Sequence, residues 1–248
     1  MMTEQEYITL HAALKRMRLS GMAEELKEQF ESAGDVELSA DERIRRMIQA
    51  ESTLRDDKKI ARIVKAACFK YPQAAVDTDI AQKQGADSSL LESLSSCDWI
   101  SRGRNLLITG KTGSGKSYCA CALGVAAAGQ FMSVRYIKAS ELLRKLESAE
   151  TRHCLSEELN CYAKYDLLIV DDFGLMNLNS TNCRNLFELI DTRLDRKSTI
   201  FVSQLPVANW YNLFQDDTYA DACLDRLTGN SSYRLSFDGE SLRRRKKL

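Results

Sequence analysis

Residues 105–117 read N-L-L-I-T-G-K-T-G-S-G-K-S, an apolar run that leads into a loop rich in glycine. The stretch from Gly110 to Ser117 satisfies the pattern G-x-x-x-x-G-K-[ST] in full, and the helical segment 116–129 follows it. Glycine lets the backbone of such a loop turn its N–H groups inward around phosphate oxygens. A strand, this loop and a helix in direct succession therefore predict a nucleotide-phosphate site, in preference to a glycine-rich turn that arose by chance.

Each part of this loop has an expected role in holding ATP and Mg²⁺. Lys116 is expected to reach the β- and γ-phosphates and to act in catalysis, and the Ser117 hydroxyl to ligate the metal. The helix that begins near Lys116 adds the positive end of its dipole. The expected nucleotide-binding residues are Gly110, Lys111, Thr112, Gly113, Ser114, Gly115, Lys116, Ser117 and Tyr118.

Short apolar, β-branched runs alternate with helical segments in the C-terminal part of the chain. The expected strands are 105–109, 133–137, 166–171 and 198–203, and the expected helices are 116–129, 140–149, 155–164 and 180–196. Strands that alternate with helices predict a parallel sheet covered by helices on both faces. The fold class predicted for this region is therefore α/β.

The N-terminal part has a different pattern of apolar residues. Residues 4 to about 70 show helical periodicity, and Ser39 and Glu42 have the spacing of a capping box that opens a second helix. Pro72, Gly85 and polar neighbours then mark a connecting segment. We expect a helical N-terminal domain at 1–95 and an α/β domain at 96–248.

The composition narrows the class of protein. Lys and Arg total 35, as do Asp and Glu, so the net charge gives no information about partners. No apolar run approaches the roughly 20 residues that span a bilayer, and the N-terminus M-M-T-E-Q-E-Y is acidic and polar. The eight cysteines form no C-x-x-C pair and only two histidines accompany them, so we expect reduced thiols and no zinc site. A cytoplasmic protein without membrane contact is expected.

A buried strand with two acids at its end occurs at residues 165–174, which read Y-D-L-L-I-V-D-D-F-G. In nucleotidases of the phosphate-loop class, a buried strand beside the loop strand delivers an Asp to the magnesium ion. Asp171 is therefore the expected metal ligand, and Asp172 is positioned to orient or deprotonate the attacking water. The letters D-F-G also occur in protein kinases, but H-R-D-x-x-x-x-N is missing upstream and the glycine loop is of another type.

The phosphate loop and several further motifs together resemble one family, the IstB-like helper ATPases of insertion sequences, an AAA+ branch related to the DnaC helicase loaders. The motifs are D-D-F-G (171–174), S-Q-L-P (203–206), A-D-A-C-L-D-R-L (220–227), K-R-M-R-L-S-G-M-A (15–23), C-D-W-I (97–100) and G-E-S-L-R (239–243). Many unrelated ATPases share the phosphate loop, whereas these motifs in this order are more specific. The resemblance implies an AAA+ P-loop domain preceded by a small all-α domain for partner, DNA or oligomer contacts.

Three further catalytic residues are implied by the resemblance. Gln204 lies at the sensor-1 position, where it would hold the attacking water or detect the γ-phosphate. Arg226 lies at the arginine-finger position and would act on nucleotide in a neighbouring subunit. Arg243 lies at the sensor-2 position. Each arginine also has an ordinary alternative: Arg226 could pair with Asp225 or Asp221 on its own helix, and Arg243 opens R-R-R-K-K, a run typical of a solvated tail.

One position departs from the AAA+ pattern. Many AAA+ proteins carry Glu where this chain has Asp172, and Asp is shorter by one methylene. Its carboxylate would lie further from the γ-phosphate unless the backbone compensates. We therefore expect slow turnover, suited to a timer.

The resemblance implies a bacterial protein whose ATP-bound form oligomerises on duplex DNA, remodels it and recruits or activates an IstA-like transposase, with hydrolysis resetting the assembly. Basic residues gather in the helix 43–65, in K-A-S-E-L-L-R-K (138–145) and at the C-terminus, and each run is also compatible with a solvated face. Lys138, Arg144 and Lys145 are the favoured DNA contacts. A DnaC-like replicative helicase loader is the alternative, and a small-molecule kinase is a more distant one.

Overall fold

A computed structural model of the chain describes residues 2–32, 38–229 and 232–242. By its internal contacts the chain divides into two compact units, Met1–Arg62 and Ile63–Leu248. This division comes earlier in the chain than the predicted domain boundary between residues 95 and 96, which rests on the change in residue pattern. The difference arises because Phe69, Leu91 and Leu94 are buried in the same hydrophobic core as the sheet.

The first unit is made of helices. They are α1 (Glu4–Arg16), α2 (Ser20–Glu31) and α3 (Ala40–Ala67), the last of which continues past the boundary between the units. The Ser39 hydroxyl accepts a hydrogen bond from the Glu42 N–H at 3.3 Å, so α3 begins at the predicted cap. The buried carboxylate of Glu51 accepts the Gly21 N–H at 2.7 Å and fixes α2 against α3. No described helix is both long and apolar enough to cross a membrane.

The second unit is built on a five-stranded sheet in the order β2-β3-β4-β1-β5, and every neighbouring pair is parallel. The strands are β1 (Asn105–Gly110), β2 (Val134–Lys138), β3 (Leu167–Phe173), β4 (Ser198–Ser203) and β5 (Ser232–Phe237). The predicted parallel sheet is confirmed. Strand β5 was not predicted, although it pairs with the full length of β1.

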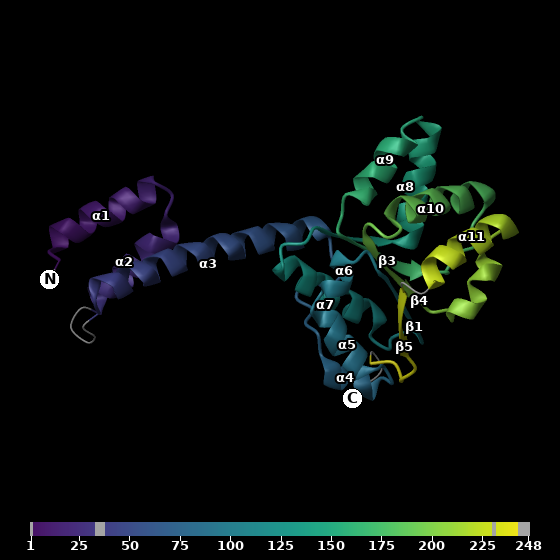
Figure 1. Cartoon of the computed structure of the whole chain (residues 1–248), viewed down its shortest axis with the longest axis horizontal. Coiled ribbons are helices and arrows are strands. Elements are labelled where there is room, and N and C mark those ends of the chain that lie inside the picture. Colours follow the sequence, from purple (N-terminus) through teal and green to yellow (C-terminus); the bar gives the residue numbers. More distant parts are fainter. Residues whose placement is uncertain (1, 33–37, 230–231, 243–248) are drawn as a thin grey trace. The chain divides into compact units, whose positions relative to one another are not determined.

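Helices cover both faces of this sheet (Figure 1). The α-helices are α4 (Thr78–Lys83), α5 (Ser88–Ser95), α6 (Asp98–Ser101), α7 (Lys116–Gly129), α8 (Ala139–Thr151), α9 (Leu155–Ala163), α10 (Ser180–Arg193) and α11 (Asp217–Thr228). Two 3₁₀ turns precede α11, namely η1 (Val207–Asn209) and η2 (Tyr211–Leu213).

Two hydrophobic cores lie on opposite faces of the sheet, because successive residues of a strand point to opposite sides. In β3, Leu167 and Ile169 join the core that α5 and α7 cover, while Leu168 and Val170 join the core of α8 to α11. Both faces of the strand are therefore buried. This explains why the run reads as continuously apolar instead of alternating.

The position of the acid-bearing strand differs from the prediction. Strand β4 lies between β1 and β3, so Asp171 is not carried by a neighbour of the loop strand. An apolar run that ends in an acid specifies a buried strand, but its place in the sheet depends on the crossover connections. All strands of a parallel sheet still end at one edge, and Ser117 at the start of α7 contacts Asp171 across that edge.

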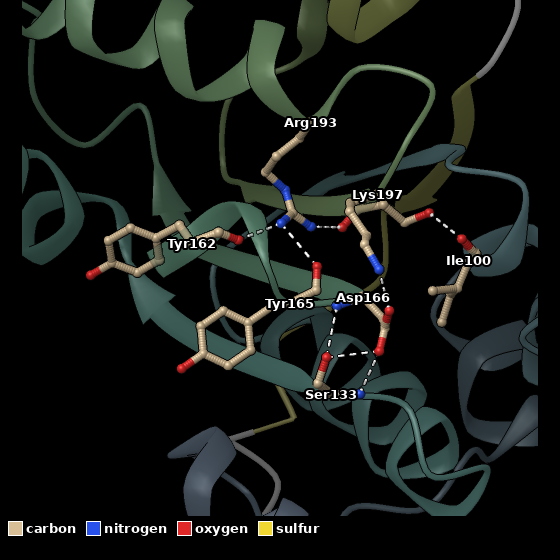
Figure 2. Close-up of polar contacts among 8 residues, drawn as sticks. Ile100, Ser133, Tyr162, Tyr165, Asp166, Arg193 and Lys197 are labelled. Carbon is tan, nitrogen blue, oxygen red and sulfur yellow. Dashed lines mark hydrogen bonds and ion pairs between the residues drawn. The ribbon is translucent and has the colours of Figure 1, made fainter. Parts of the chain in front are cut away.

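A buried arginine joins the opposite, amino-terminal ends of the strands. Arg193 is 2% exposed and its guanidinium donates to the carbonyls of Tyr162 (2.5 Å), Tyr165 (3.0 Å) and Ser198 (2.5 Å) (Figure 2). It also donates to the Thr199 hydroxyl at 3.0 Å. Burial lowers the pKa of Arg193 to about 10, so the side chain remains charged at pH 7. The arginine thus holds the end of α9, the start of β4 and the turn before β3 together.

A second polar group extends this junction. Lys197 donates to the Asp166 carboxylate at 2.5 Å, and the same carboxylate accepts the Ser133 N–H at 2.8 Å and the Ser133 hydroxyl at 2.7 Å (Figure 2). These contacts join the turns that precede β2, β3 and β4. Polar side chains therefore secure the edge of the sheet that lies opposite the phosphate loop.

Candidate nucleotide-binding site

The phosphate loop connects β1 to α7 and lies against the C-terminal part of the chain. Gly110 has φ 139° and Gly113 has φ 84°. A Cβ atom on Gly110 would overlap the Phe237 carbonyl, and a Cβ atom on Gly113 would overlap the Ser241 side chain. The Lys111 N–H donates to the Phe237 carbonyl at 3.2 Å, which fixes the loop to β5. Both glycines are therefore required by close approach as well as by backbone conformation.

Lys116 begins α7 and is only 7% exposed. Its ammonium donates to the Lys111 carbonyl at 2.6 Å, and the Ser114 hydroxyl donates to the same carbonyl at 2.8 Å. The lysine head is thus held over the loop, where the N–H groups of the first turn of α7 also face. This arrangement suits the β- and γ-phosphates that the sequence predicts at this position.

The two predicted metal ligands lie together at the edge of the sheet. The Ser117 hydroxyl donates to Asp171 Oδ1 at 3.0 Å, and the Asp172 N–H donates to the same oxygen at 2.8 Å. Asp171 is fully buried. A buried carboxylate beside a serine hydroxyl is a set of hard oxygen donors that fits Mg²⁺.

Protein ligands for this metal are few. Among the described residues there is no group of three or more His, Cys, Asp or Glu side chains that could hold a metal ion. Mg²⁺ is commonly bound by one or two protein oxygens together with waters and substrate phosphates, which is the arrangement that Ser117 and Asp171 allow. When bound there, the ion would neutralise charge on the β- and γ-phosphates.

Tyr136 of β2 is a functional residue that the sequence reasoning missed. Its hydroxyl donates to Asp171 Oδ2 at 2.5 Å, and the side chain is buried. Burial raises the pKa of Tyr136, and the hydrogen bond to Asp171 raises it further, so the hydroxyl stays protonated and remains a donor. Tyr136 thereby orients the Asp171 carboxylate. The missing signal was the sheet order, which places β2 beside β3.

A polar cavity of about 180 Å³ opens beside these residues. Asp172 and Gln204 both line it, together with Lys70, Thr112, Gly113, Lys116, Ser117, Asp171, Val202 and Ser203. Gln204 accepts a hydrogen bond from the Thr112 hydroxyl at 2.6 Å, so the end of β4 contacts the phosphate loop. Lys116, Asp171, Asp172 and Gln204, which the sequence predicts to be catalytic, thus converge on one space.

A second cavity, of about 430 Å³, adjoins the first and is lined mainly by apolar side chains. The two share Gly113, Lys116 and Ser117. The remaining walls come from the phosphate loop and from segments on both sides of it, with Tyr71, Ala75, Val76, Asp77, Ile80, Ala81, Leu91, Ser114, Gly115, Tyr118, Cys119, Ala122, Phe237 and Leu242 as lining residues. A base and sugar fit an apolar cavity at one end of the loop, and phosphates fit the polar cavity at the other.

The segment that supplies Tyr71, Val76 and Ile80 was predicted to be a connection only. The rings of Tyr71 and Tyr118 are 5.7 Å apart and tilted by 52°, and the Tyr118 hydroxyl accepts the Ala75 N–H at 3.3 Å. The aromatic and apolar residues of K-Y-P-Q-A-A-V (70–76) are the sequence signal that could have indicated a cavity-lining segment. Tyr118, in contrast, was predicted as a nucleotide contact and does line the cavity.

Arg226 lies outside both cavities of its own chain. It donates to Asp191 of α10 at 2.9 Å, and its guanidinium lies 4.6 Å from the centre of the Phe187 ring. The ion pair that the sequence allowed with Asp225 or Asp221 is therefore replaced by one to another helix. Arg243 lies outside the described residues.

The three predicted DNA contacts lie at the end of β2 and on α8. Lys138 is exposed and its ammonium lies 3.9 Å from the Asp172 carboxylate. Lys145 pairs with Glu141 at 2.9 Å, whereas Arg144 is exposed. Lys138 precedes α8 in extended conformation, and within α8 Arg144 is turned by about 100° from Lys145. Lys138 therefore belongs to the nucleotide edge as well as to the proposed DNA face.

The parallel sheet, the phosphate loop and the buried acid at the end of β3 define a P-loop nucleotide-binding protein. A model of the family described as IstB-like ATP binding protein matches residues 12–248. The chain belongs to this family, and the resemblance drawn from its motifs is confirmed.

Individual relatives agree with this membership. A protein of Sinorhizobium fredii named as an insertion sequence ATP-binding protein is 37% identical over 93% of both chains. The protein of Pseudomonas fluorescens named as the ATP-binding protein of insertion sequence IS1162 is 40% identical over 83% of this chain and 88% of its own. The solved DnaC helicase loader shares the fold, with a TM-score of 0.52, 18% identity and coverage of 68% of this chain and 99% of that one.

Proposed function

We propose that the protein is a Mg²⁺-dependent ATPase that assists transposition: it oligomerises on duplex DNA, remodels that DNA and recruits or activates a partner transposase, and hydrolysis resets the assembly. The observation that carries the proposal is the polar cavity where Lys116, Ser117, Asp171, Asp172 and Gln204 converge. Membership of a family whose relatives carry insertion-sequence names supports the transposition context.

The residues of the cavity divide the work of ATP hydrolysis. Lys116 and the N–H groups of the loop hold the phosphates, and Tyr136 keeps Asp171 oriented toward Ser117. Asp172 accepts a proton from the attacking water, and Gln204 holds that water or the γ-phosphate. A developing negative charge would still need a further cation.

Arg226 supplies that cation from a neighbouring subunit in this proposal. Its position outside both cavities of its own chain supports action in trans. The ion pair with Asp191 holds the guanidinium on α11, facing α10, and would orient it for a second copy. Oligomerisation would therefore complete the site and make hydrolysis depend on assembly.

The first test compares ATP hydrolysis by the full chain with and without duplex DNA. We expect stimulation by duplex DNA and dependence on Mg²⁺, because assembly on DNA brings Arg226 to the neighbouring nucleotide. Hydrolysis that is fully active in a monomer and indifferent to DNA would contradict the proposal. Affinity capture from bacterial extract separates the transposition role from that of a helicase loader, since recovery of a replicative helicase in place of a transposase would favour the loader.

The DNA face is tested by a K138A/R144A/K145A variant. Each lost phosphate contact lowers the slope of log affinity against log salt by about 0.9, so we expect weaker duplex binding and a slope shallower by about two to three units. A K83A/K164A/R196A variant, which removes two exposed lysines and one exposed arginine of the same unit, is the matched control. Unchanged affinity and unchanged salt dependence in the triple variant would exclude this face, provided that ATP binding is retained.

A further inference from the structure

The end of α3 and the segment that follows it are anchored to β2 and α7. Arg135 donates to the Ala66 carbonyl at 3.2 Å, and the ring of Phe69 packs where a side chain on Gly124 would lie. The Tyr118 hydroxyl holds the Ala75 N–H. Contacts at both ends and in the middle therefore fix the path of residues 66–75 beside the nucleotide cavities.

Two adjacent residues of this segment line different cavities. Tyr71 lines the apolar cavity and Lys70 lines the polar one. A nucleotide whose base lies near Tyr71 and whose phosphates follow the loop would bring its terminal phosphate into the space that Lys70 lines. Lys70 thus lies on the phosphate side of the site, in the same cavity as Lys116.

Lys70 has the charge and the freedom that a phosphate contact needs. Its ammonium lies 4.0 Å from Asp171 Oδ2, which is longer than a hydrogen bond, and 5.6 Å from the centre of the Tyr71 ring. The Asp171 carboxylate already accepts hydrogen bonds from Ser117, Tyr136 and the Asp172 N–H. It therefore does not need the donors of Lys70, which can turn toward a phosphate oxygen.

The balance of charge in the polar cavity also supports a phosphate contact by Lys70. The side chains that line it carry two carboxylates, Asp171 and Asp172, and two ammonium groups, Lys70 and Lys116. A bound triphosphate adds several negative charges, and Lys116 together with one Mg²⁺ ion does not offset all of them and the two carboxylates. A second lysine in this partly buried space therefore has more negative charge to offset when the terminal phosphate is present.

We propose that Lys70 binds the terminal phosphate of ATP in the same chain and distinguishes ATP from ADP. The inference rests on the proposed function, because it takes ATP as the ligand. The alternative is a purely structural role, in which Lys70 offsets the charge of Asp171. The two roles differ in a measurable way, since only a terminal-phosphate contact affects ATP without affecting ADP.

The test is a titration of the full chain with fluorescent analogues of ATP and ADP at fixed Mg²⁺, for the parent and for K70M, K70R and K164M. A charged hydrogen bond contributes on the order of a tenfold change in affinity. We expect K70M to bind ATP about tenfold more weakly and ADP as the parent does, K70R to recover part of the loss, and K164M to match the parent. Lys164 is an exposed lysine beside the opposite edge of the sheet.

The outcomes separate the two proposals. A K70M protein with the parental ratio of ATP to ADP affinity, or one that loses both equally, would overturn the role of Lys70 while leaving the ATPase proposal intact. A parent protein that binds no ATP would overturn the proposed function, and the role of Lys70 with it. If K70M does not fold by thermal melting, K70Q provides a neutral variant that keeps a polar head and is held to the same expectation.

Discussion

Asp172 occupies an unusual backbone conformation at the tip of β3. Its φ is 58°, in the left-handed region that Asp tolerates better than most residues. The register between β3 and β4 shifts between Val170 and Phe173, so the chain bulges at the acid. A bulge re-aims a side chain, which gives a physical means by which the backbone compensates for the shorter Asp. The expected slow turnover stays a prediction.

Replacement of Asp172 by Asn tests its proposed role as the base. Asn has the same shape and also tolerates positive φ, so D172N should bind ATP as the parent does. Loss of the general base should slow steady-state hydrolysis by about 10²–10⁴-fold. Asp195 is an exposed Asp with φ 54° at the opposite edge of the sheet, and D195N is therefore the matched control.

Measurements of the turnover rate at saturating ATP test whether Asp172 acts as the general base. Hydrolysis by D172N at the parental rate would remove this residue from the mechanism. A comparable loss in D195N would indicate a general effect of Asn at positive φ.

At the scale of the elements, the regular strands and helices followed from local pattern. Helix α7 has the predicted bounds, and β4 matches its predicted range. Helix α10 ends at Arg193, earlier than residue 196, because the arginine turns inward and the chain must reach β4. Strand β5 (S-Y-R-L-S-F) carries exposed and polar residues on one face, so its sequence lacked the apolar run that marks a buried strand.

Arg193 is the element-scale contact whose loss should cost most. R193L leaves two buried carbonyls, one part-buried carbonyl and the Thr199 hydroxyl without their donor, and each buried unsatisfied group costs about 1–3 kcal/mol. We expect the free energy of unfolding to fall by about 3 kcal/mol or more. Both tryptophans, Trp99 and Trp210, are buried in the second unit, so urea unfolding followed by their fluorescence measures this change.

An exposed arginine nearby provides the control for that measurement. Arg196 lies three residues further along the chain and is exposed, so R196L should change stability by less than about 0.5 kcal/mol. Equal stability of R193L and R196L would show that the carbonyls find other partners.

At the scale of the whole molecule, the division into units determines which fragment can bind nucleotide. The fragment 63–248 keeps Phe69, Leu91 and Leu94 in the core and keeps Tyr71 and Lys70 in the cavities. The fragment 96–248 loses all of them. We expect the longer fragment to melt cooperatively and bind ATP, and the shorter one to do neither, as measured by circular dichroism and nucleotide titration.

If the shorter fragment folds and binds ATP, the domain boundary lies between residues 95 and 96, as the sequence predicts. The sequence assigns residues 63–95 to the N-terminal domain because Pro72, Gly85 and the polar stretch 82–89 are typical of a connecting segment. Their few apolar side chains belong to a core only because α7 and the sheet pack against them in the folded chain.

The sequence by itself determined the phosphate loop, the buried acid at the end of a strand, the α/β class and the family. These features are local, because each depends on residue types at fixed spacing along one segment. The tertiary structure decided what depends on segments distant in the chain: the place of β4 between β1 and β3, the hydrogen bond from Tyr136 to Asp171, the pairing of Arg226 with Asp191 and the place of Lys70 in the lining of the polar cavity. Lateral strand order and crossover paths set those contacts, and no spacing along a single segment encodes them.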